Sequence, residues 1–86
     1  MKLKQKFILR EIANEAILIP IMNKDDLFNG VISLNETGVF IWKQLENEKS
    51  KEEIVSALLE EYEVSIEQAR KNVDDFFANL EKLHLL

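Results

Sequence analysis

The amino-acid sequence predicts an α+β domain in which a three-stranded antiparallel β-sheet is followed by three α-helices. The chain has 86 residues, 47% of them hydrophobic, which suits one folded domain with a single core. Short apolar runs separated by polar turns fill the part before Asn35. Helix-start signals at Asn35, Ser50 and Ser65 divide the remainder.

The first two strands are expected at residues 6–12 and 16–22. Both runs are rich in Ile and Leu, and Asn14-Glu15 between them suits a tight turn. Pro20 lacks the N–H that a neighbouring strand would bind, so it indicates a sheet edge, a bulge or the end of a strand.

A third strand is expected from about Leu27 or Gly30 to Leu34. The loop that leads into it contains Leu27 and Phe28, which are unusually apolar for a turn. Because the connections are short, an antiparallel meander is predicted, with the third strand at an edge of the sheet.

The first helix is expected over residues 36–46. Asn35 is suited to be its N-cap, since a short side-chain oxygen accepts a hydrogen bond from the first turn. Gly38 in that turn would let the helix approach the sheet closely. Apolar residues, including Trp42, lie on several sides of this helix, which predicts a central position between the sheet and the other helices.

The second and third helices begin with similar signals. Ser50 is followed by Glu53 and Ser65 by Gln68, both at the spacing of a capping box. Each helix carries an apolar stripe that is expected to face the core. The stripe of the second helix comprises Ile54, Val55, Leu58, Leu59 and Tyr62. That of the third comprises Ile66, Ala69, Val73, Phe76, Phe77, Leu80 and Leu83.

Composition and charge exclude several functional classes. The chain has no Cys, so disulfides and thiolate metal sites are excluded, and a reducing cytoplasm is the expected location. The longest apolar run, residues 16–22, is too short to cross a membrane. The net charge is −5, with +4 on residues 1–10 and −9 on the rest. The helical part therefore has the wrong sign for nucleic acid.

Nothing in the sequence points to catalysis, and no catalytic residue, metal site or cofactor is expected. The only histidine, His84, lies near the C-terminus, and Ser50 and Ser65 are accounted for as helix caps. No Gly-rich, phosphate-binding loop is present.

Several short motifs recur in this order in one known family. They are Arg10-Glu11-Ile12 with Glu15 and Leu18, then Leu34-Asn35-x-Thr37-Gly38 with Ile41-Trp42, then Glu53-Ile54 with Leu58 and Tyr62, and finally Val73, Phe76, Phe77 and Leu80. On these residues the chain resembles the PqqD family, which includes the precursor-peptide recognition elements of many pathways that make ribosomally synthesised, post-translationally modified peptides (RiPPs). The resemblance covers nearly the whole chain.

The resemblance implies a winged-helix-like domain that binds peptides without catalysing a reaction. Such a domain would act as a peptide chaperone: it would bind the leader segment of a precursor and present it to a modifying enzyme, often a radical S-adenosylmethionine (SAM) enzyme. The leader would lie as an extra strand along the third strand, beside the third helix. Neither nucleic acid nor a membrane is an expected partner.

The physics of an edge strand leads to the same site. Its free N–H and C=O groups are a template for an added strand, and pockets for alternate side chains supply selectivity. The peptide-binding residues predicted on this basis are Val31, Ile32, Ser33, Leu34, Val73, Phe76, Phe77 and Leu80. Core packing is the competing interpretation for the residues of the third helix, and Phe76 and Phe77, being adjacent, cannot point to one spot.

Two other functions fit the same predicted fold. One is a winged-helix DNA-binding regulator, although residues 66–83 carry a net charge of −1, which disfavours it. The other is a structural accessory domain that docks on a larger protein. The identities of the peptide and enzyme, and the oligomeric state, do not follow from the sequence.

Overall fold

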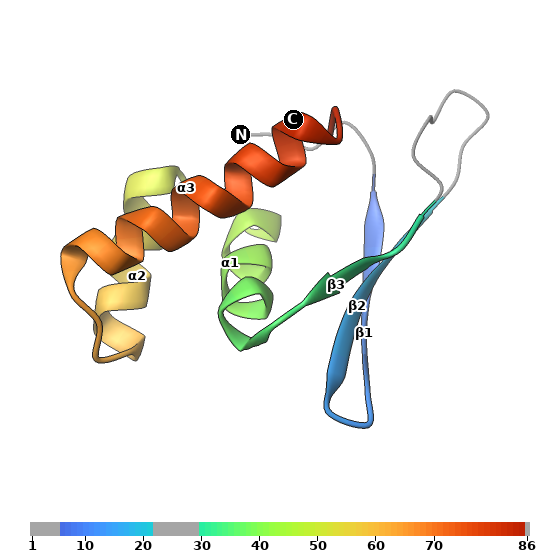
Figure 1. Cartoon of the computed structure of the whole chain (residues 1–86), viewed down its shortest axis with the longest axis horizontal. Coiled ribbons are helices and arrows are strands. Elements are labelled where there is room, and N and C mark those ends of the chain that lie inside the picture. The colour runs from blue at the N-terminus through green and yellow to red at the C-terminus, as the bar shows by residue number, and fades with distance from the viewer. Residues whose placement is uncertain (1–5, 22–29, 86) are drawn as a thin grey trace.

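A computed structural model of the chain describes residues 6–21 and 30–85. Three strands, β1 (Phe7–Ile12), β2 (Glu15–Pro20) and β3 (Ile32–Leu34), precede three helices. The helices are α1 (Glu36–Glu46), α2 (Lys51–Glu61) and α3 (Ile66–Lys82). The predicted α+β fold is confirmed. Figure 1 shows the helices gathered on one side of the sheet.

The first two strands form an antiparallel hairpin, with Phe7 opposite Pro20 and Ile12 opposite Glu15. Its turn consists of Ala13 and Asn14, one position earlier than predicted, and both residues have positive φ angles, 50° and 68°. Such two-residue turns match the twist of the flanking strands. Pro20 is the last residue of β2, as one of the predicted alternatives required.

The third strand is shorter than predicted. It begins at Ile32, and neither Gly30 nor Val31 belongs to it. The alternative start at Leu27, and the Leu27-Phe28 loop itself, lie outside the described residues. The strand order is β1-β2-β3, with Leu34 opposite Ala16, so the predicted edge position of β3 is confirmed.

All three helices begin at the predicted caps. The Gly38 N–H donates to the Asn35 side-chain oxygen at 2.8 Å. The capping box of α2 is complete, because the Glu53 N–H donates to Ser50 Oγ at 3.2 Å and the Ser50 N–H donates to a Glu53 carboxylate oxygen at 2.9 Å. The Gln68 N–H donates to Ser65 Oγ at 3.1 Å.

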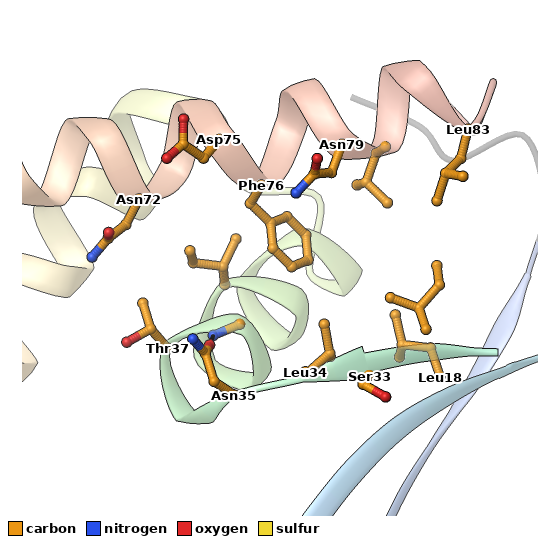
Figure 2. A pocket seen from close by; sticks show the side chains of 14 residues that line it. Leu18, Ser33, Leu34, Asn35, Thr37, Asn72, Asp75, Phe76, Asn79 and Leu83 are labelled. Atoms are coloured by element: carbon orange, nitrogen blue, oxygen red, sulfur yellow. Dashed lines mark hydrogen bonds between the residues drawn. The ribbon is translucent and has the colours of Figure 1, made fainter.

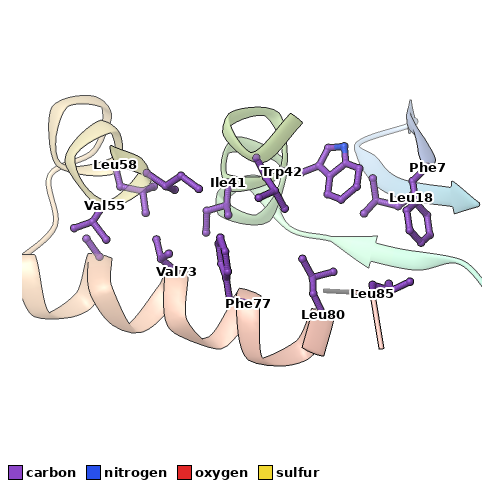
Figure 3. Packing of buried hydrophobic residues seen from close by; sticks show 13 residues of the cluster. Phe7, Leu18, Ile41, Trp42, Val55, Leu58, Val73, Phe77, Leu80 and Leu85 are labelled. Carbon is purple, nitrogen blue, oxygen red and sulfur yellow. The ribbon is translucent and has the colours of Figure 1, made fainter. Parts of the chain in front are cut away.

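The core continues from the sheet through α1 to the other two helices (Figure 3). Helix α1 contacts α2, α3 and β3, which confirms its predicted central position. Trp42 is buried, and its ring meets the ring of Phe7 edge-on at 5.8 Å between centroids. The apolar stripes of α2 and α3 are narrower than predicted, because Leu59, Ile66 and Leu83 are exposed.

Candidate functional site

A groove of about 350 Å³ lies between β3 and the C-terminal half of α3 (Figure 2). The strand contributes Ile32 and Leu34 to one wall, since their side chains point to the helical side of the sheet, as does their neighbour Leu18. The helix contributes Phe76, Leu80 and Leu83 to the opposite wall. Both walls therefore carry apolar side chains.

The main chain of β3 forms the open border of this groove. One edge of β3 pairs with β2, with Ser33 opposite Ile17 and Ile32 opposite Leu18. Within residues 6–21 and 30–85, no strand pairs with its other edge. An edge strand carries N–H and C=O groups that remain available for pairing with another chain.

Polar side chains of α3 line the rim of the groove. Asn72, Asp75 and Asn79 all belong to its lining, and Figure 2 shows Asn72 and Asn79 pointing toward the space between helix and strand. Lys71 Nζ donates to Asp75 Oδ2 at 2.8 Å, and this hydrogen bond raises the pKa of Lys71. The pair is exposed and one helical turn apart, so it holds the Asp75 carboxylate without adding much stability.

The junction between β3 and α1 closes one end of the groove. Gly38 lines this end, and a Cβ atom there would lie 3.2 Å from Asn35 Oδ1 and 3.3 Å from Leu34 Cδ2. Both distances are tight for carbon, so glycine lets the first turn of α1 approach the end of the strand. The close approach predicted for Gly38 is present.

The structure brings five of the eight predicted peptide-binding residues to the groove: Ile32, Ser33, Leu34, Phe76 and Leu80. Val31 precedes the strand and is 60% exposed, outside the groove lining. Val73 and Phe77 are fully buried in the core and do not line the groove, so for these two residues the structure agrees with the competing interpretation, core packing. They point toward the other helices, and Lys51 Nζ lies 5.2 Å from the centre of the Phe77 ring.

Helix α3 therefore presents two adjacent stripes. One stripe, comprising Ala69, Val73, Phe77 and Leu80, is buried. The other, comprising Asn72, Phe76, Asn79 and Leu83, faces the groove, and Leu80 contributes to both. The residues of the second stripe are spaced four, three and four apart, which is the helical period. Two of the four, Asn72 and Asn79, are polar, and neither was predicted to be a site residue.

The described residues contain no group of three His, Cys, Asp or Glu side chains placed to hold a metal ion. Likewise, no helix in the described part of the chain is long and apolar enough to cross a membrane. What the groove offers is an open strand edge, an apolar wall and amide side chains at the rim.

Comparison with known proteins identifies similar chains. The model of a family described as "Coenzyme PQQ synthesis protein D (PqqD)" matches residues 15–86. A solved structure described as "TbiB1 in Complex with the TbiA(beta) Leader Peptide" is similar at 29% sequence identity, with a TM-score of 0.78. The match covers 100% of this chain and 94% of that one. No curated protein matches.

Proposed function

Because this chain belongs to the PqqD family, as its motifs predicted, we propose that it binds the leader segment of a ribosomally made precursor peptide. The leader adds to β3 as a further strand beside α3. The domain then presents the precursor to a modifying enzyme, such as a radical SAM maturase.

The observation that carries this proposal is the open edge of β3 beside an apolar groove of about 350 Å³. Pairing of main chains holds almost any extended sequence. Side chains of the added strand alternate, so every second one points into the groove. There it meets Phe76, Leu80 and Leu83, which favours leaders that place apolar residues at alternate positions.

The rim adds a second element of recognition. The side-chain amides of Asn72 and Asn79 each carry donors and an acceptor, and both lie where an added strand would pass. They would bind main-chain or polar side-chain groups of the guest. Peptide selectivity thus comes from apolar pockets and a few directional hydrogen bonds together.

In this role the domain needs no chemistry of its own, and we propose that it is not an enzyme and uses no cofactor. The TbiB1 structure is described as a complex with a leader peptide, which is consistent with a binding role. A precursor is met where ribosomes release it, so the proposed role places the domain in the cytoplasm.

Titration with fluorescent leader peptides tests the proposal. The peptides are synthesised from short precursor genes beside the gene of this chain, and binding is followed by fluorescence anisotropy. We expect saturable binding by at least one leader and no binding to duplex DNA at physiological salt. If the folded protein binds none of the leaders at tens of micromolar, the proposal is wrong.

Two matched variants locate the binding site. Phe76→Ala removes an apolar part of the groove wall and should weaken leader binding by about tenfold or more, as expected for a central aromatic contact. Phe40→Ala is the control, because Phe40 is also half-buried but packs edge-on against Tyr62 outside the groove lining. Equal losses of affinity in both variants would exclude the groove as the site.

A further inference from the structure

The side of the sheet that is turned away from the helices carries exposed apolar side chains. Phe7 and Leu18 are buried against the helices, and side chains alternate along a strand, so their neighbours in the sequence point the other way. We name this surface the outer face. It comprises Ile8, Arg10 and Ile12 of β1, Glu15, Ile17 and Ile19 of β2, Ser33 of β3, and Val31 just before β3.

The apolar residues of the outer face are open to different degrees. Ile12 is 64% exposed, Val31 60% and Ile8 44%, whereas Ile17 and Ile19 are half-buried. The solvent side of an antiparallel sheet normally carries polar residues. Exposed apolar side chains that are grouped on one face instead mark a surface that another molecule covers.

Two opposite charges accompany these apolar side chains. Arg10 and Glu15 are both exposed, and among the residues that the structure describes neither takes part in an ion pair. The two charges cancel, so the outer face has no net charge, although the whole chain carries −5. A surface with one charge of each sign can complement a second copy of itself.

The positions of four residues make this complementarity geometric. Arg10 lies opposite Ile17 on the neighbouring strand. One step closer to the hairpin turn, Ile12 lies opposite Glu15. The four side chains therefore form a quadrilateral with the two charges on one diagonal and the two isoleucines on the other.

A twofold axis along the isoleucine diagonal satisfies all four positions at once. If a second copy is placed face to face about this axis, Arg10 of each copy meets Glu15 of the other, within reach of the long Arg side chain. Ile12 and Ile17 lie on the axis, so each meets its own symmetry mate. An interface of this kind makes every contact twice, which gives two ion pairs around an apolar centre.

We infer that two copies of this chain associate through the outer face, about a twofold axis that pairs Arg10 of one copy with Glu15 of the other. The inference goes beyond the proposed function and does not depend on it. The leader groove lies on the helical side of β3 and the outer face on the opposite side, so both grooves of the dimer stay open.

The diagonal pattern favours a second copy over an unrelated partner. Association of two copies requires a surface that complements itself, whereas a different protein has no need of such a pattern. Repulsion between the copies is small at this face, because residues 1–21 carry four basic and two acidic groups, a net +2, and the other −7 lies in the rest of the chain.

The size of the face sets the strength of association. It has eight residues in each copy, against roughly 20–30 in an interface of standard size, so the dimer should be weak and depend on concentration. Sedimentation velocity of the full chain between about 10 μM and 1 mM covers the range in which such a dimer forms. We expect the wild type to pass from monomer to dimer within it.

Reversing the two charges separately and then together tests the pairing. Arg10→Glu and Glu15→Arg should each weaken the dimer by about tenfold or more, because each variant brings like charges together twice. In an equimolar mixture, one variant presents two acidic and the other two basic side chains. The mixture should therefore associate at least as tightly as the wild type.

A third variant and two controls complete the set. Ile12→Ser removes the apolar centre and should also weaken the dimer, and circular dichroism should show an unchanged fold because Ile12 is exposed. Lys49→Glu and Glu60→Arg make the same charge changes at exposed positions outside the outer face. Neither control should alter association, alone or mixed with the other.

The remaining outcomes overturn the inference. A wild type that stays monomeric over the whole range, or a dimer that persists in both charge variants, excludes the outer face as a contact between copies. Variants that are monomeric alone and remain so when mixed show that Arg10 and Glu15 do not pair. If the wild type is monomeric and the outer-face variants lose binding to the modifying enzyme, another protein covers the face.

Leader binding separates this inference from the proposed function. Leader affinity, measured by fluorescence anisotropy, should be unchanged in the three outer-face variants, because the groove lies on the other side of the sheet. A dimer that binds no leader contradicts the proposed function alone, and a monomer that binds leader contradicts the dimer alone.

Discussion

Replacing each of the two adjacent phenylalanines of α3 should have opposite consequences. Phe77 is fully buried in the core, whereas Phe76 is half-buried on the groove wall. We expect Phe77→Ala to destabilise the fold severely. Phe76→Ala should leave the fold largely intact and impair leader binding instead.

The magnitudes follow from burial. Replacing a fully buried Phe by Ala costs about 3–5 kcal/mol in the free energy of unfolding, including the cavity that remains. A domain of this length is stable by roughly 4–13 kcal/mol, so Phe77→Ala removes a large part of the total. Phe76 is only half-buried, and its loss costs about 1 kcal/mol on the same scale of apolar area.

Chemical unfolding measures both changes. Trp42 is the only tryptophan and is buried, so its fluorescence reports the loss of the core, and circular dichroism reports the loss of the helices. For a domain of this size each kcal/mol lowers the melting temperature by about 4–8 °C. Phe77→Ala should therefore melt at least about 12 °C below the wild type, and Phe76→Ala less than about 8 °C below it.

One result would refute the assignment of the two rings. If Phe77→Ala lost less than about 1 kcal/mol, an effect typical of a mild substitution, Phe77 could not fill the core as described. If Phe76→Ala were the more destabilised variant, the rings would have exchanged roles, and the groove would need a different wall.

Three other predictions concern the α2 cap, acid stability and the strand edge. Ser50→Ala should cost about 1 kcal/mol of stability in urea unfolding, because it removes the α2 cap, whereas Ser56→Ala at an exposed position of the same helix should cost almost nothing. The N–H and hydroxyl groups of Ser50 hold the pKa of Glu53 below 4.5, so the stability that this carboxylate contributes is present above pH 4.5 and is lost as the pH falls through the lowered pKa. The urea midpoint of Glu53→Gln should therefore fall less steeply with acid than that of the wild type. An unchanged slope would disprove the linkage. Ile32→Pro removes a backbone N–H from β3 and should abolish leader binding, while Ile32→Val should retain it. Circular dichroism checks that both variants are folded. Strong leader binding by a folded Ile32→Pro would contradict pairing along β3.

Local chemistry made the helix starts and the edge strand predictable. Asn35, Ser50 and Ser65 each place an acceptor before an apolar period, and the caps are present at all three. The hairpin turn was displaced by one residue because Ala13 adopts a positive φ angle, which its residue type disfavours. Pairing across the hairpin overrides that preference, and pairing between distant residues is not visible in a local pattern.

The division of α3 into core and groove was not predictable from its apolar stripe. Neighbouring positions on a helix differ by 100°, so Phe76 and Phe77 both belong to a stripe that spans a third of the circumference. The boundary between them is set by where β3 ends and α1 begins, which is a tertiary feature. Asn72 and Asn79 were missed for a related reason, because polar side chains on a groove rim have the same pattern as a solvated face.

This division has a consequence for how such a small domain combines stability with recognition. Helix α3 uses Val73 and Phe77 for the core and Asn72, Phe76 and Asn79 for the groove. If the leader binds in this groove as proposed, stability and peptide selectivity depend largely on different residues of one helix, with Leu80 the shared position. The groove stripe can change to suit a new leader with little cost to the fold. The sheet is divided in a similar way: its inner face packs on the helices, while among residues 6–21 and 30–85 no strand pairs with the outer edge of β3.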